Sequence, residues 1–210
     1  MRKKQYRRKA KIREAPGIEM ESPKQALTRT KIWNVSLDLF AQNGFEQTTV
    51  EEIATTAGVS RRTFFRHFES KSDLMSYAVM RYGTLLINAI QECPQGSSQP
   101  RLFRYIVGQV AQQTIGDSCM RKLMAIAATQ RSAREAQLSG VSVLQDRITK
   151  ALVERKLNPV TAAIVAELSL SALSMTYRIW YRSKDRSAAS TVEYVLVTLA
   201  HLICENDSEP

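Results

Sequence analysis

Residues 53–74 read IATTAGVSRRTFFRHFESKSDL and contain the most informative spacing in the chain. Ala54 is followed four residues later by Gly58, and Ser60 precedes a short basic segment. A small residue lets two helices approach closely, and glycine gives the backbone freedom for a sharp turn. Serine is also a common helix N-cap. The spacing therefore predicts a helix-turn-helix whose second helix covers 61–67.

That second helix has two different faces. At 100° per residue, Phe64 and Phe68 share one side and anchor the helix to the core. Arg62 and Arg66 lie nearly opposite, in position to enter a major groove about 12 Å wide. The alternative is a basic, solvated helix in an ordinary bundle. We predict DNA contacts from Thr49, Arg61, Arg62, Thr63, Phe65, Arg66, His67 and Lys71.

These side chains suit different parts of a DNA duplex. Arginine reads guanine through two hydrogen bonds, so we expect Arg62 and Arg66 at base edges, and Phe65 against a thymine methyl. His67 and Lys71 are expected at phosphates, Lys71 beside a helix N-terminus whose amides also attract anions. Arg61 is assigned to either a base or a phosphate.

On both sides of this motif, the spacing of apolar residues predicts helices. A helix over 28–43 ends at Asn43-Gly44, and Thr49 with Glu52 forms a capping box for a helix over 50–57. Ser70 with Asp73 opens a helix over 71–92. After a loop over 94–100, further helices are predicted at about 100–115, 118–130, 132–156, 159–182 and 188–204. Capping signals support three of them: Ser132 with Glu135, Asn158-Pro159, and Ser190 with Glu193. Because no alternating strand pattern occurs, the predicted fold class is all-α with about nine helices.

The net charge of +10 is concentrated at the N-terminus. Residues 1–24 hold nine Lys or Arg against three Glu, a net charge of +6. With few apolar side chains, this segment is predicted to be a disordered basic tail, either merely solvated or an arm that neutralises DNA phosphates. Met20 is an alternative to Met1 as the expected start, and with it most of this segment would be absent from the protein. We place the DNA-binding domain at 25–75 and a second domain at 76–210.

Composition argues against several classes of protein. With 44% hydrophobic residues and no run of about 18 uncharged apolar ones, no transmembrane helix or membrane partner is expected. Three well-separated cysteines and two histidines predict no disulfide framework, metal site or cofactor, and a reducing cytoplasm as the location. A redox role for Cys119 is the alternative to a plain buried thiol. The sequence offers no catalytic constellation, so an enzyme is not expected.

Residues 29–74 resemble the DNA-binding domain of the TetR/AcrR family of bacterial transcription regulators. Residues 58–74, GVSRRTFFRHFESKSDL, follow the family signature almost throughout. Phe65 departs from the family's usual tyrosine, whose hydroxyl commonly touches a phosphate, and the long basic tail is a second departure. The family's first helix and following turn are matched by Ile32, Leu39, Phe40, Gly44, Thr48 and Thr49.

The resemblance implies that residues 76–210 form a ligand-binding and dimerising helical bundle. Long uncharged stretches in helices 159–182 and 188–204 suit an interface between two copies, the alternative being core helices of a monomer. The candidate pocket residues are Tyr105, Met120, Met124, Tyr177, Arg178, Trp180 and Tyr181, with Arg104 and Arg121 as further partners for an acidic ligand.

We therefore expect a cytoplasmic, nucleoid-associated homodimer that binds a near-palindromic operator in double-stranded DNA. It is expected to act as a repressor and to be released by a small-molecule effector. The alternative is a ligand-independent DNA-binding or architectural protein dominated by its basic tail. Release of sequence-specific binding by a small molecule would distinguish the two.

Overall fold

The computed structural model describes residues 22–183 and 187–204. This part of the chain contains nine α-helices and no strand, which confirms the predicted all-α fold. Residues 1–21, most of the predicted basic tail, lie outside the described residues. The helices are α1 (Pro23–Asn43), α2 (Val50–Thr56), α3 (Arg61–His67), α4 (Lys71–Glu92), α5 (Gln99–Thr114), α6 (Ser118–Thr129), α7 (Arg131–Glu154), α8 (Pro159–Arg182) and α9 (Ala188–Cys204).

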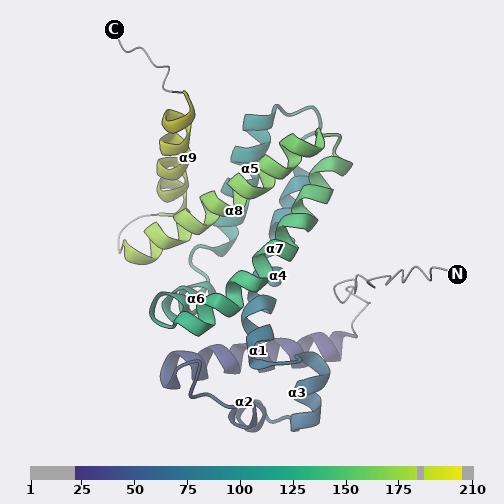
Figure 1. Ribbon diagram of the computed structural model, residues 1–210, viewed down its shortest axis with the longest axis vertical. Coiled ribbons are helices and arrows are strands. Elements are labelled where there is room, and N and C mark those ends of the chain that lie inside the picture. The colour runs from purple at the N-terminus through teal and green to yellow at the C-terminus, as the bar shows by residue number, and fades with distance from the viewer. Residues whose placement is uncertain (1–21, 184–186, 205–210) are drawn as a thin grey trace, which may run out of the picture.

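The molecule is elongated, with α1, α2 and α3 at one end and α9 near the other (Figure 1). Helix α4 leaves the small three-helix unit and enters a larger bundle, where it packs against α7 and α5. In that bundle α8 packs against α5, α7 and α9. Gly83 of α4 allows the close approach to α7, because a Cβ at this position would overlap the Leu144 side chain.

Two hydrophobic cores fill the structure, and α4 takes part in both. Leu74 and Ala78 are buried with the residues of α1, α2 and α3, whereas Leu86 and Ile90 are buried in the larger bundle. Helix α6 contributes Leu123 and Ile126 to the first core as well. The predicted domain boundary at 75/76 therefore falls inside α4. Side chains of this one helix contribute to both hydrophobic cores.

Polar caps explain why several predicted boundaries agree with the structure. Thr49 with Glu52 and Ser70 with Asp73 form complete capping boxes at α2 and α4. The Asn158 side chain accepts a hydrogen bond from the Val160 amide at the start of α8, where proline occupies the first turn. Each box satisfies amide groups that a helix start leaves without an intrahelical partner.

Two predicted capping boxes are wrong. Helix α7 begins at Arg131, one residue before Ser132, and Glu135 accepts a hydrogen bond from the Arg131 side chain instead. Ser190 lies inside α9, and its amide donates to the hydroxyl of Ser187. In both cases the serine lies within the first turn of the helix rather than before it.

The first helix starts earlier than predicted. Ser22 and Gln25 form a capping box and Pro23 is the first residue of α1, so Pro23 and Lys24 are helical rather than part of the tail. The predicted tail extended to residue 24, although proline is well suited to the first turn of a helix.

Candidate DNA-binding face and ligand cavity

The turn between α2 and α3 is short and is held by backbone hydrogen bonds. Gly58 has φ +64° and its amide donates to the Thr55 carbonyl at 3.0 Å, while the Val59 amide donates to the Ala54 carbonyl at 2.9 Å. Ala54 is buried where the two helices meet. A left-handed φ favours glycine, so this position fixes the angle at which α3 leaves the turn.

The inner face of α3 is aromatic. Phe64 is fully buried and Phe68 nearly so, and their ring centroids lie 5.8 Å apart. Phe68 also meets the Tyr77 ring of α4 edge-on at 5.5 Å. The Trp33 indole of α1 donates to the Leu74 carbonyl of α4 at 3.2 Å, so α1 and α4 are tied together behind α3. Burial of these rings holds α3 rigidly from one side.

The outer face of α3 carries the predicted reading residues. Arg62, Phe65 and Arg66 are exposed, and Thr63 is half-buried with its amide bonded to the capping hydroxyl of Ser60 at 3.0 Å. No carboxylate among the described residues pairs with Arg62 or Arg66. Their guanidinium groups are therefore available to hydrogen-bond acceptors outside the protein.

Arg61 and Thr49 already have partners within the protein. Arg61 forms an ion pair with Glu51 of α2 and lies over the Phe65 ring, 5.4 Å from its centroid. The Thr49 hydroxyl takes part in the α2 capping box, donating to Glu52 at 3.1 Å. A DNA contact by either side chain would have to share or replace these bonds. His67 is half-buried at the end of α3.

The Lys71 side chain, a predicted phosphate contact, already has hydrogen-bond acceptors within the protein. Its ammonium group donates to the carbonyl oxygens of Phe45, Glu46 and Thr48, the last two at 3.0 and 3.1 Å, and lies 4.6 Å from the centre of the Phe45 ring. All three of its hydrogens thus have acceptors in the segment between α1 and α2. These bonds hold that segment on α4, and the predicted phosphate contact would have to compete with them.

Lys31 of α1 is a candidate that the sequence did not reveal. It is exposed, and its ammonium group lies beside Gly58, 3.5 Å from where a Cβ would stand. A cation next to the helix-turn-helix is placed to meet a phosphate. Its position depends on how α1 crosses α2, so no local sequence pattern could have predicted it.

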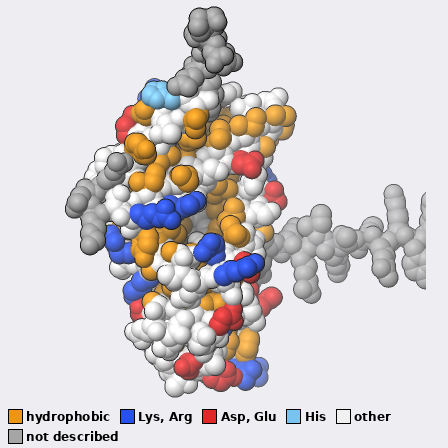
Figure 2. Space-filling model, turned by 60° about the vertical axis from the view of Figure 1, so that its left-hand side comes forward, with side chains coloured by type: hydrophobic (Ala, Val, Ile, Leu, Met, Phe, Trp, Pro, Cys, Tyr) orange, Lys and Arg blue, Asp and Glu red, His pale blue; other side chains and the backbone are white. Residues whose placement is uncertain are grey.

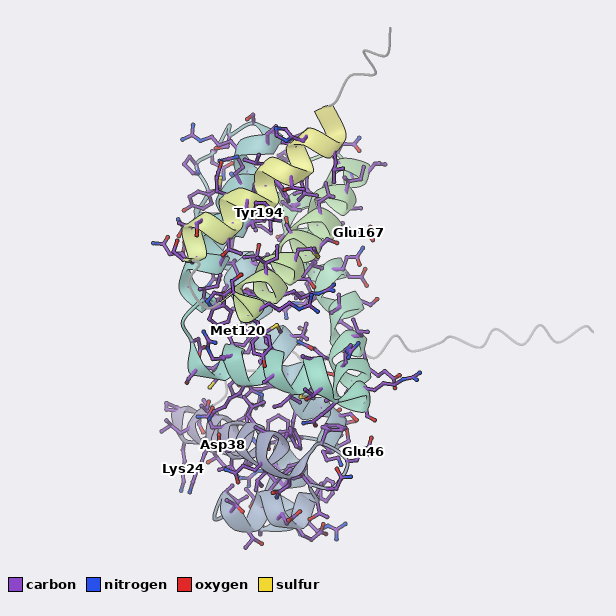
Figure 3. The ribbon with its side chains drawn as sticks, turned by 90° about the vertical axis from the view of Figure 1, so that its left-hand side faces the viewer. Lys24, Asp38, Glu46, Met120, Glu167 and Tyr194 are labelled. Carbon is purple, nitrogen blue, oxygen red and sulfur yellow. The ribbon has the colours of Figure 1, made fainter. Side chains whose placement is uncertain are left out.

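A cavity of about 500 Å³ lies in the larger bundle, between α4, α5, α6, α7 and α8. Of the predicted ligand residues, Met120, Met124, Tyr177, Arg178 and Tyr181 line it. Met120 lies between α6 and the end of α8 in Figure 3. The remaining lining residues include Tyr82, Leu86, Leu123, Arg134, Leu138, Leu144, Leu170, Leu173 and Arg182.

Four other predicted ligand contacts do not line the cavity. Tyr105 is half-buried against the bundle core, and Trp180 is buried beneath Arg121, whose guanidinium carbon lies 4.6 Å from the Trp180 ring centroid. Arg104 forms an ion pair with Glu193 of α9 at 2.8 Å. These residues join helices to one another.

Two phenols provide polar groups in the cavity. Tyr82 donates to a carboxylate oxygen of Asp117 at 2.8 Å, and burial raises its pKa. The Tyr177 and Thr114 hydroxyls are hydrogen-bonded at 2.9 Å, and burial raises the Tyr177 pKa to about 12. Both phenols therefore stay neutral at physiological pH and serve as hydrogen-bonding groups rather than as bases.

Burial also raises the pKa of the Cys119 thiol, and the neighbouring Asp117 carboxylate acts in the same direction. Because the thiolate is the reactive form, this environment opposes the redox role that the sequence left as an alternative.

Helix α6 lies between the cavity and the DNA-binding unit. Leu123 lines the cavity and also belongs to the first hydrophobic core, and Lys122 forms an ion pair with Asp38 of α1. At the end of α6, the side-chain amide of Gln130 makes two hydrogen bonds. Its Nε2 donates to the Phe40 carbonyl at 2.9 Å, and its Oε1 accepts from the backbone N–H of Phe45 at 2.6 Å. A displacement of α6 would therefore reach the segment that precedes α2.

The outer sides of α8 and α9 expose apolar residues. Ile164 is 52% exposed, and Met175, Tyr194 and Val197 are also exposed. Figure 2 shows hydrophobic side chains gathered on the face that includes these helices, and Figure 3 shows Tyr194 on the same side. By length and composition α8 could also cross a membrane, but here it packs against four other helices, α5, α6, α7 and α9.

Residues 32–78 match the model of a family described as bacterial regulatory proteins, tetR family. The chain is 32% identical over 99 residues to the transcriptional regulator TcmR of Streptomyces glaucescens, spanning 45% of this chain and 43% of that protein. It is 28% identical over 204 residues to AcrR of Shigella flexneri, spanning 87% and 93% of the two chains.

The fold has solved counterparts as well. One is the transcriptional regulator FadR from Bacillus subtilis, whose structure is a complex with stearoyl-CoA. It superposes with a TM-score of 0.56 at 15% identity and covers 81% of this chain and 96% of its own. At this identity the similarity concerns the fold. The matched residues 32–78 include α2 and α3 of the helix-turn-helix.

Proposed function

We propose that the chain is a DNA-binding transcription regulator of the TetR/AcrR type, acting as a homodimeric repressor that a small molecule releases; the family match at residues 32–78 and the similarity to AcrR support this. The observation that carries the DNA-reading part is the outer face of α3, where Arg62 and Arg66 have no carboxylate partner among the described residues. Their guanidinium groups are expected at base edges in the major groove.

Dimerisation is proposed through α8 and α9. One helix-turn-helix reads only a few base pairs, whereas two copies related by a two-fold axis meet successive major grooves of a near-palindromic site. The exposed apolar side chains of Ile164, Met175, Val197 and Leu202 support this assignment, because their contact with a second copy would remove them from water.

Ligand response is proposed through the cavity and α6. The cavity volume of about 500 Å³ is in the usual range for small-molecule sites, and Leu123 links its wall to the DNA-binding core. An effector that fits the cavity better in a DNA-incompetent arrangement lowers operator affinity, and DNA lowers effector affinity by the same factor. FadR, with its bound stearoyl-CoA, is a precedent for ligand binding on this fold.

The proposal is tested by selecting bound duplexes from a random DNA library with the full chain. We expect a two-fold symmetric consensus and a complex with two chains per duplex. Enrichment of no sequence, with affinity governed by salt alone, would instead support a ligand-independent architectural protein. The same purified complex then serves for screening small molecules that dissociate it.

A further inference from the structure

The charged side chains of the cavity lining are all of one sign. Arg134 comes from α7, and Arg178 and Arg182 lie one turn apart at the end of α8. Among the residues described, no Asp or Glu lines the cavity. The rest of the lining is mostly apolar, from residues such as Leu86 and Leu144. A hollow with low-dielectric walls and one sign of charge concentrates ions of the opposite sign.

The three guanidinium groups are not neutralised by the described part of the protein. None of Arg134, Arg178 and Arg182 has a carboxylate partner there, and the Nε of Arg134 donates to the Ala127 carbonyl at 2.9 Å. All three residues are exposed, so they lie where the cavity meets solvent. Figure 2 shows Lys and Arg side chains around a hollow on this face of the molecule.

We propose that the cavity binds an amphipathic anion. Its apolar body lies among the aliphatic and aromatic residues, and its carboxylate, sulfonate or phosphate group lies at Arg134, Arg178 and Arg182. Guanidinium groups suit this role because they bind planar or tetrahedral oxyanions through paired hydrogen bonds. Bringing three cations to one rim is unfavourable through mutual repulsion, and an anion relieves that repulsion.

The cavity volume also limits the size of the ligand's apolar body. Its volume of about 500 Å³ accommodates a fused two-ring aromatic or a medium-length acyl chain. Tyr82 and Tyr177 remain neutral, so they do not oppose an anion by charge. A cationic ligand would find three like charges and no carboxylate in the described lining.

This assignment names the class of effector and rests on the proposed ligand response, but its test does not require DNA. The probes are 8-anilinonaphthalene-1-sulfonate and N-phenyl-1-naphthylamine, which share one aromatic body and differ in the sulfonate. Fluorescence titrations of the full chain measure both affinities at fixed salt. We expect the sulfonate to bind at least tenfold more tightly than the neutral amine, and decanoate to displace it.

Substitution of Arg134, Arg178 and Arg182 together by Gln should remove that preference while changing the affinity for the neutral amine less than twofold. The double variant Arg178→Gln with Arg182→Gln avoids the Arg134 contact to α6 and should lose most of the preference. Arg101→Gln, at an exposed position on α5 outside the lining, is the matched control and should change neither affinity. Circular dichroism verifies that each variant is folded.

Equal affinities for the two probes in the unmodified chain, or an unchanged sulfonate affinity in the folded double variant, would overturn the proposal. Unchanged binding of both probes after Ala127→Phe, which narrows the cavity, would also overturn it by placing the probes elsewhere. Operator binding is measured separately without probe. Its failure would contradict the proposed regulator function while leaving the probe result intact, so the two failures are distinguishable.

Discussion

At the scale of single residues, the basic side chains of the helix-turn-helix unit differ in what they contact. Arg61 is paired with Glu51, Lys71 is enclosed by three carbonyl oxygens, and Arg62 and Arg66 are exposed without a described carboxylate partner. A positive charge in a DNA-binding unit is thus not by itself a DNA contact. The partners already present within the protein decide which cations remain available.

Replacing either Arg62 or Arg66 by alanine is expected to cost about 1–3 kcal/mol of operator binding and to relax base preference at one position per half-site. The reason is that each loses a two-pronged hydrogen bond to a guanine edge. Fluorescence anisotropy with the selected operator and with single-base variants measures this loss. Arg101→Ala on α5 serves as control. Equal losses on operator and random DNA would show phosphate contacts only.

Replacing Lys71 by methionine is expected to lower the free energy of unfolding by about 1–3 kcal/mol, because carbonyl oxygens of the α1–α2 segment lose a charged donor. Urea denaturation measures this, with Lys150→Met at an exposed site on α7 as control. The slope of log K against log salt should stay unchanged. A slope shallower by about 0.9, with stability unaffected, would instead support the predicted phosphate contact of Lys71.

At the scale of elements, the predictable features were those encoded by neighbouring residues. Gly58 and the capping boxes of Thr49 and Ser70 predicted helix boundaries well, because a cap acts within one turn. The early start of α1 was also encoded, since Ser22-Pro23-Lys24-Gln25 is a capping box with proline in the first turn. It was missed because residues 1–24 were assigned to a disordered tail from their charge and composition.

Long-range packing was not predictable in the same way. Lys71 reaches residues more than twenty positions away, and Trp180 lies beneath Arg121 rather than in the cavity. Arg134 and Arg182, by contrast, were never candidates, because nothing local to them signals a cavity. Which side of a helix faces a hollow depends on how five helices pack, and composition alone could not provide that.

The junction of α6 and α7 gives a prediction at this scale. Gln130→Ala leaves the Phe45 amide and the Phe40 carbonyl without their side-chain partner, so the free energy of unfolding should fall by about 1–3 kcal/mol. Operator affinity should fall as well, because the segment before α2 loosens. Gln112→Ala, exposed on α5, is the control. Unchanged stability and unchanged operator affinity would show that this contact does not support the DNA-binding unit.

At the scale of the whole molecule, the question is how two helix-turn-helix units are held at the distance between successive major grooves of DNA. A dimer through α8 and α9 requires their outer faces to be buried in the pair and exposed in the single chain. Leu173, in an apolar stretch that suggested the interface, is only 3% exposed and lines the cavity, so it cannot serve that purpose. Ile164 on α8 and Val197 on α9 are exposed and can.

Glutamate at Ile164 or Val197 should therefore leave the fold intact and separate the chains, because a buried, unpaired carboxylate at an interface costs several kcal/mol whereas an exposed one does not. The same change at Val143, exposed on α7, is the matched control and should leave the pair intact. Light scattering gives the mass and circular dichroism the helicity. A monomer of unchanged helicity should lose almost all operator affinity, because the two half-sites are then bound independently. If such a monomer still binds the full operator tightly, dimerisation is not what positions α3 in successive grooves.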